Sequence, residues 1–211
     1  VALFAASGRV YTPTLLVSYG GPWAENYYYA RENPHDDPKL RRFMPHSEVD
    51  QATRRRGGGP SPGPAGWFMD EEHVFQDHAR FVADLVAAGG KAGVGSHGQL
   101  QGLGYHWELW SVASGGLSNH DALRVATLHG AEAIGLENDL GSIEVGKLAD
   151  LVVLDRNPLE NIRHTEAISH VMMNGRLFEG DSLREIWPRQ RDLEPLWWWD
   201  REPVGLPGVG N

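Results

Sequence analysis

The sequence predicts an α/β fold with parallel strands, and three observations support this. Residues 5–10 and residues 87–92 each run from a helix end through glycine and a basic residue into an apolar segment. Two such units in succession, joined through a helix, imply parallel strands and a right-handed crossover. From Gly141 onwards the apolar residues fall instead in short, alternating runs, as in antiparallel strands.

Composition excludes several classes of protein. The 211 residues carry 28 acidic and 19 basic side chains, a formal net charge of −9, which argues against a nucleic-acid partner. Cysteine is absent, so disulfides and cysteine-ligated zinc sites are excluded. No apolar run reaches the roughly 20 residues of a membrane span, and we expect no membrane partner.

The first part of the chain is expected to hold one helix end and one strand. Residues 1–8 have the pattern of a helix end, with Gly8 as its left-handed cap, which suggests a piece of a longer protein. Residues 9–18 predict a buried strand that Pro13 interrupts on one side. Residues 19–69 show no period and are too long for an ordinary connection, so we expect a functional lid or disorder.

The middle of the chain predicts three helices and one short strand. Asp70 is expected to cap the first helix, whose apolar residues recur at helical spacing. Ser118 has Asp121 three residues on, close to a capping box, and is expected to open the third helix. Helices are expected over residues 71–88, 106–114 and 118–134, and the strand over residues 91–97.

The last third predicts antiparallel strands and an irregular tail. The Asn174-Gly175 dipeptide fits a tight hairpin turn best and lies between two apolar runs. Strands are expected over residues 151–154, 168–173 and 176–178. The tail, residues 181–211, is rich in Pro and Trp and shows no period, so we expect it to lie against another part of the protein.

Three stretches of the sequence resemble one known family. They are GSHGQLQGLGYHWELW at residues 95–110, LSNHDALRVATLHGAEAIGL at residues 117–136 and LGSIEVGKLADLVVLDRNPLENI at residues 140–162. Together they resemble the C-terminal part of the amidohydrolase superfamily, above all its imidazolonepropionase- and prolidase-like members, including those fused to an N-terminal β-propeller. Neither the residues nor the resemblance indicates a compartment; a propeller fusion is compatible with the cell envelope or secretion.

The resemblance implies a fragment of a (β/α)8 TIM-like barrel, its last two βα units, followed by part of a small C-terminal β-sandwich. Residues 9–18 would be strand seven and residues 91–97 strand eight of this barrel. The implied division of the chain is a barrel part over residues 1–138 with a long loop at 19–69, a sandwich segment over 139–180, and a Trp- and Pro-rich tail over 181–211.

The same resemblance implies a metal-dependent hydrolase that cleaves the C–N bonds of small amides, cyclic amides or dipeptides. In such enzymes a divalent metal, commonly zinc, activates the attacking water. The family's HxH pair does not occur among the ten His of this chain. We therefore expect the metal in the complete enzyme, no catalytic metal on this chain alone, and contact with the missing barrel half or with a second copy.

The implied site lies at the carboxyl end of strand eight, where the family's "GTD" or "GSD" is here Gly95-Ser96-His97. A neutral His can bind one metal or act as a base, but it brings no negative charge. His97 is thus the leading catalytic and metal-binding candidate, and its replacement of the Asp leaves open a non-catalytic binding or scaffolding protein on the same fold. Weaker catalytic candidates are His106 and Glu108, and candidate substrate contacts are Tyr19, Trp23, Gln99 and Tyr105.

Overall fold

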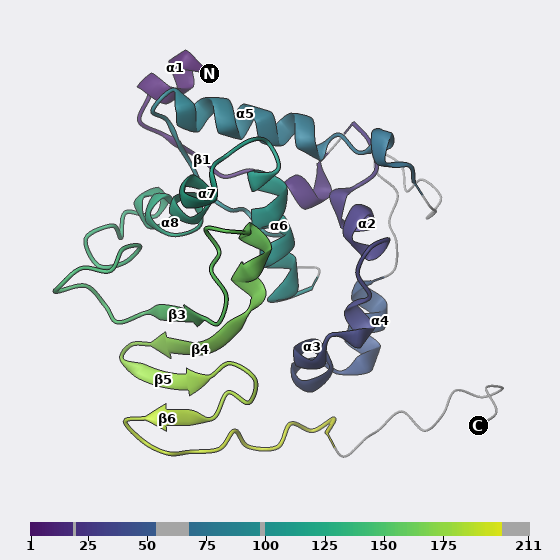
Figure 1. The fold of residues 1–211 in the computed structure, drawn as a ribbon, viewed down its shortest axis with the longest axis vertical. Coiled ribbons are helices and arrows are strands. Elements are labelled where there is room, and N and C mark those ends of the chain that lie inside the picture. The colour runs from purple at the N-terminus through teal and green to yellow at the C-terminus, as the bar shows by residue number, and fades with distance from the viewer. Residues whose placement is uncertain (19, 54–67, 98–99, 200–211) are drawn as a thin grey trace.

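The computed structural model of the chain describes residues 1–18, 20–53, 68–97 and 100–199. Its fold is mixed α/β: a two-stranded parallel sheet lies among helices, and a four-stranded antiparallel sheet follows in the C-terminal part (Figure 1). Within the described ranges, no helix combines the length and the apolar character that crossing a membrane requires.

The parallel pair consists of β1 (Val10–Tyr11) and β2 (Lys91–Ala92), with Val10 opposite Lys91. Parallel pairing of these two segments is therefore confirmed. Helix α5 (Phe75–Ala87) precedes β2 and packs its buried apolar side against the core. The short helix α1 (Ala2–Ala6) ends as expected, because Gly8 adopts a left-handed φ of 68°.

Both strands are shorter than predicted. After β1, Pro13 has no N–H to donate to a ladder, and Leu15–Val17 turns into the 3₁₀-helix η1. After β2, the chain is irregular up to His97. The two segments nevertheless stay side by side beyond the strands, since the Gly93 N–H donates to the Tyr11 carbonyl at 2.9 Å.

The predicted helix start at Asp70 is wrong. Asp70–Glu72 form a separate 3₁₀-turn, η3, and α5 begins at Phe75. The Glu72 carboxylate accepts from the Met69 backbone N–H at 2.7 Å, and Asp70 is paired instead with Arg31. Asp70 and Glu72 thus bond to groups outside α5, and neither caps that helix.

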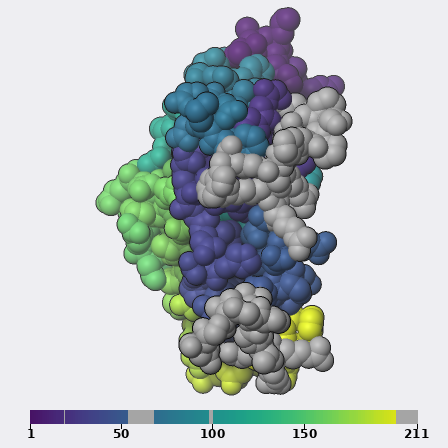
Figure 2. Space-filling model, turned by 90° about the vertical axis from the view of Figure 1, so that its right-hand side faces the viewer, coloured from purple at the N-terminus to yellow at the C-terminus, as the bar shows by residue number. Residues whose placement is uncertain are grey.

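The expectation of an irregular segment over residues 19–69 is wrong for much of its described part. Local capping explains the helices: Asn33 and Asp37 accept from backbone N–H groups, and Pro occupies the first helical position after each. The elements are α2 (Ala24–Tyr29), η2 (Pro34–Asp36), α3 (Pro38–Phe43) and α4 (His46–Ala52). Figure 2 shows this purple-to-blue segment along the middle of one face of the molecule.

Three helices follow β2: α6 (Leu103–Ala113), α7 (Asn119–Ala126) and α8 (Leu128–Ala133). The Ser118 side chain accepts from the Asp121 N–H, which confirms the predicted cap. The predicted single helix to Ile134 is wrong, because Thr127 leaves the helical region at φ −127° and ψ −85° and separates α7 from α8.

The antiparallel sheet has the strand order β3-β4-β5-β6. Its strands are β3 (Leu151–Leu154), β4 (Ile168–Met173), β5 (Arg176–Glu179) and β6 (Glu185–Trp187), with the 3₁₀-helix η4 (Ile162–Glu166) between β3 and β4. Asn174 and Gly175, at φ of 49° and 75°, turn β4 into β5, so the predicted hairpin is confirmed.

The tail is more regular than its sequence suggests. Strand β6 pairs with β5 in a part of the chain where we expected no period. The indole N–H groups of Trp198 and Trp199 both donate to the Arg42 carbonyl, so these two residues of the tail lie against α3.

The main hydrophobic core lies between α5, α6, α2 and η1, beside the parallel pair. Its large members come from segments far apart in the sequence. They include Leu15, Leu16, Tyr28, Phe75, Val82, Trp107 and Val125. Much of helix α6 is buried, because α5, η1, α7, α2 and the 3₁₀-helix η4 pack around it.

Candidate functional site at the strand ends

The carboxyl ends of β1 and β2 are joined by close backbone contact. The Thr14 hydroxyl donates to the Gly95 carbonyl at 2.5 Å. A Cβ added to Gly95 would lie 2.3 Å from the Pro13 carbonyl oxygen, so only glycine fits there without a shift. The carboxyl ends of parallel strands are where α/β barrels gather their functional side chains.

His97 follows directly after this contact and its side chain is exposed. Its position at the end of the β2 segment is the one from which a side chain can serve a site at these strand ends. The structure thus brings Thr14 and Gly95 together at one edge of the parallel pair, and His97 follows Gly95 by two residues.

Glu108 reaches the same edge from helix α6 and is completely buried. Its Oε1 accepts from the Leu15 N–H at 2.6 Å, and its Oε2 accepts from the Leu16 N–H at 2.9 Å. Burial raises the pKa of Glu108 to about 7, although the two backbone N–H groups oppose that shift. The Glu108 side chain therefore bonds to the backbone after β1 and is not exposed at the surface.

His106 lies on the same helix but faces the 3₁₀-helix η4. Its Nδ1 is 3.1 Å from the Thr165 hydroxyl of η4. Burial, with a smaller contribution from Lys39, lowers the pKa of His106 to about 4, while Asp37 opposes the shift. The imidazole is therefore neutral near pH 7 and links α6 to η4.

The predicted substrate contacts fall into two groups. Trp23 is half-buried just before α2, and its buried indole N–H has no hydrogen-bond partner among the described residues. The exposed Tyr105 donates its hydroxyl to the Ala126 carbonyl at 3.1 Å, at the end of α7. Tyr19 and Gln99 lie outside the described residues.

Sequence reasoning missed an aromatic cluster behind the strand ends. Tyr28 stacks on Trp107 with ring centroids 5.0 Å apart and planes 8° apart. The Tyr28 hydroxyl shares a hydrogen bond of 3.0 Å with Ser111, and the Trp107 indole donates to Glu32 at 2.9 Å. The three consecutive tyrosines at 27–29 and the two tryptophans of α6 were the available signal.

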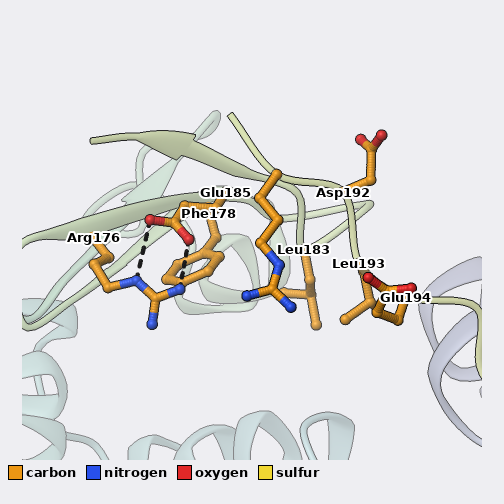
Figure 3. Close-up of a pocket in the computed structure, with 8 residues that line it drawn as sticks. Arg176, Phe178, Leu183, Glu185, Asp192, Leu193 and Glu194 are labelled. Atoms are coloured by element: carbon orange, nitrogen blue, oxygen red, sulfur yellow. Dashed lines mark hydrogen bonds and ion pairs between the residues drawn. The ribbon is translucent and has the colours of Figure 1, made fainter. Parts of the chain in front are cut away.

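The described residues do not by themselves make up a metal centre. Among them, no group of three or more His, Asp or Glu side chains could hold a metal ion. A pocket of about 170 Å³ lies elsewhere, at β5, β6 and the residues that follow (Figure 3). Figure 3 shows the Arg176 guanidinium directed at the Glu185 carboxylate, an ion pair that occupies one side of this pocket.

Comparison with known proteins gives both a family and named relatives. Residues 70–178, just over half of the chain, match the amidohydrolase family. Over 62 residues the chain is 40% identical to a 5-methylthioadenosine/S-adenosylhomocysteine deaminase of Teredinibacter turnerae, which covers 29% of this chain and 14% of that protein. Over 39 residues it is 56% identical to an imidazolonepropionase of Symbiobacterium thermophilum, which covers 18% of this chain and 9% of that protein.

A solved structure extends the likeness beyond these segments. A prolidase complexed with N-methylphosphonate-L-proline is 28% identical, with a TM-score of 0.50, over 84% of this chain and 36% of the prolidase chain. The chain thus spans well under half the length of each of these three proteins. The family match over residues 70–178 establishes that the chain belongs to the amidohydrolase family.

Proposed function

We propose that this chain is part of a metal-dependent hydrolase that cleaves C–N bonds in small amides, cyclic amides or dipeptides. In this proposal β1 and β2 are the last two strands of a (β/α)8 barrel, and β3–β6 belong to a small β-sandwich. The division at residues 1–138, 139–180 and 181–211 is part of the same proposal. Relatives named as a deaminase, an imidazolonepropionase and a prolidase support C–N bond hydrolysis.

The observation that carries the proposal is the parallel pairing of β1 with β2 and the close contact of Thr14 with Gly95 beyond it. In this proposal His97, two residues after Gly95, serves the carboxyl edge of the two neighbouring parallel strands, the edge used by barrel enzymes. We assign His97 to the active site, as a metal ligand or as a base. His106 and Glu108, which contact Thr165 and the Leu15–Leu16 backbone, serve this site through the position of α6.

The described residues do not supply all the ligands that the proposed metal needs. A catalytic zinc needs three protein ligands and one open position, and His97 supplies at most one of the three. We therefore place the other ligands outside the described residues, in the missing barrel half or a second copy. Trp23 and Tyr105, with Tyr19 and Gln99, are the proposed substrate contacts on this side of the site.

The test is a hydrolysis panel combined with metal analysis. The 211-residue chain, and the longest product of the same reading frame, are assayed against dipeptides, N-acyl amino acids, cyclic amides and purine amines. We expect chelator-sensitive hydrolysis of one of these C–N classes by the longer product, and no stoichiometric metal on the 211-residue chain. A folded longer product that binds these compounds without hydrolysing any of them would support the non-catalytic alternative instead.

A further inference from the structure

We propose that Glu108 is a positioning residue, whose carboxylate holds the turn η1 (Leu15–Val17) beside the carboxyl ends of β1 and β2. The inference rests on the proposed function only where it calls this segment a wall of the active site. The anchoring itself is a property of the chain as it folds.

The geometry selects a carboxylate at this position. Two adjacent backbone N–H groups, of Leu15 and Leu16, each meet a separate oxygen of Glu108, at 2.6 and 2.9 Å. A carboxylate offers an acceptor at both oxygens, whereas an amide offers one acceptor and directs its NH2 group at the second donor. Glutamine is therefore a near-isosteric side chain that cannot satisfy both N–H groups.

These two N–H groups lie at the start of η1 (Leu15–Val17), where backbone donors have no partner within the helix. The local capping residue does not bond to them either. Thr14 occupies the cap position but makes no side-chain bond to η1. Its hydroxyl instead donates to the Gly95 carbonyl, which ties β1 to the end of β2. Glu108, more than 90 residues further on, therefore does the capping.

Helix α6 also contacts α2 (Ala24–Tyr29). Ser111 lies one turn beyond Glu108 on this helix and shares a hydrogen bond of 3.0 Å with the Tyr28 hydroxyl of α2. Trp107 stacks on the same tyrosine ring. Helix α6 thus contacts both η1 and α2, and the candidate substrate contact Trp23 directly precedes α2.

A buried carboxylate is costly, and its position indicates what it is needed for. Glu108 is 0% exposed, among buried apolar neighbours such as Leu15 and Trp107. Removing a carboxylate from water costs more than burying a similar apolar side chain unless it is hydrogen-bonded. The bonds it makes here fix the turn after β1, so this buried carboxyl group serves the placement of that turn.

The first test is amide hydrogen exchange, measured by NMR on the 211-residue chain. In Glu108→Gln we expect the Leu15 and Leu16 amides to exchange at least tenfold faster relative to core amides of α5 such as Val82. The matched control is Glu185→Gln, which alters a carboxylate of 3% side-chain exposure that is paired with Arg176 in the sheet. Unchanged relative protection in Glu108→Gln, or equal loss in the control, would overturn the proposal.

A second measurement needs no variant and covers the case in which Glu108→Gln fails to fold. Couplings across hydrogen bonds are sought in the wild-type chain between the Leu15 and Leu16 amide nitrogens and the Glu108 side-chain carboxyl carbon. We expect both couplings. Their absence, in a spectrum that shows the couplings of the helix backbone, would overturn the anchoring.

The link to the active site is tested separately, on the hydrolytically active longer product. There Glu108→Gln is expected to raise KM several-fold with a smaller change in kcat, because it loosens a wall rather than removing a reacting group. A fall in kcat at unchanged KM would contradict a positioning role. If no product hydrolyses any substrate, the proposed function fails, while the exchange and coupling results still decide whether Glu108 holds η1.

Discussion

Gly95 lies against Pro13 so closely that a Cβ on the glycine would stand 2.3 Å from the proline carbonyl oxygen. The neighbouring Thr14 hydroxyl donates to the Gly95 carbonyl, so the chain after β1 and the chain after β2 form one unit. The proposed site lies next to this unit. Its packing can be tested without knowing the substrate.

Gly95→Ala is expected to destabilise the chain by about 1–3 kcal/mol, the usual cost of forcing an extra carbon into a packed site. The clash is with backbone atoms, which cannot rotate away as a side chain can. Gly130→Ala is the matched control, because Gly130 lies in α8 with its nearest neighbour at 3.9 Å. Denaturant unfolding of both variants is the measurement; equal stability of the two variants would contradict the close contact.

Stability should depend on Glu108 in the acid range. Its pKa is about 7 in the folded chain against an ordinary value of 4.5, so the folded state keeps the proton to higher pH. Protonated Glu108 therefore contributes to the unfolding free energy. That contribution is fully present below pH 4.5, and about 3 kcal/mol of it is lost as the pH rises to about 7. Unfolding curves of wild type and Glu108→Gln across this range measure it; parallel pH profiles would contradict the buried carboxylate.

His106 should act in the opposite direction. Its pKa falls from 6.5 to about 4 on folding, so the unfolded chain binds a proton that the folded chain does not. The stability it supports is present above pH 6.5 and is lost as the pH falls towards 4, by about 3 kcal/mol. His106→Gln should abolish this loss, and unfolding of the variant between pH 4 and 7 is the check.

Between pH 4.5 and 6.5 the two groups oppose each other in the wild-type chain. Glu108→Gln should therefore make stability rise with pH over this interval, and His106→Gln should make it fall. Two variants whose stabilities change with pH in the same direction would be inconsistent with one or both of the buried side chains.

The Tyr28–Ser111 hydrogen bond is expected to couple α2 to α6 by about 1 kcal/mol. Both groups are buried, and Tyr28→Phe leaves the Ser111 hydroxyl without this partner. A double-mutant cycle with Tyr28→Phe and Ser111→Ala, followed by chemical unfolding, measures the coupling energy. Additive effects of the two substitutions would show that the hydroxyls do not interact.

The parts of the fold that sequence predicted are those fixed by local chemistry. Asn174-Gly175 adopts the left-handed dihedral angles that a tight hairpin requires, and Ser118 caps α7. The parallel pairing of Val10 with Lys91 followed from two similar helix-to-strand units. Short helices such as α3 were missed because six residues carry too little periodicity to be recognised.

The site was less predictable because its contacts are distant in the sequence. Glu108 was a catalytic candidate by its place in a motif, but its partners, Leu15 and Leu16, lie more than 90 residues earlier. His106 likewise faces Thr165 across the fold rather than the strand ends. The strand after Val10 ended early because Pro13 and the Glu108 carboxylate redirect the backbone, an effect that a local reading of apolar residues does not contain.

The most direct test of the account is the turnover of His97→Ala in the longest hydrolytically active product of this reading frame. The control is His120→Ala, which removes an exposed imidazole from α7. We predict at least a tenfold loss of turnover for His97→Ala, equal to about 1.4 kcal/mol of transition-state stabilisation, and none for His120→Ala. Unchanged turnover in His97→Ala would contradict the assignment of His97 to the active site.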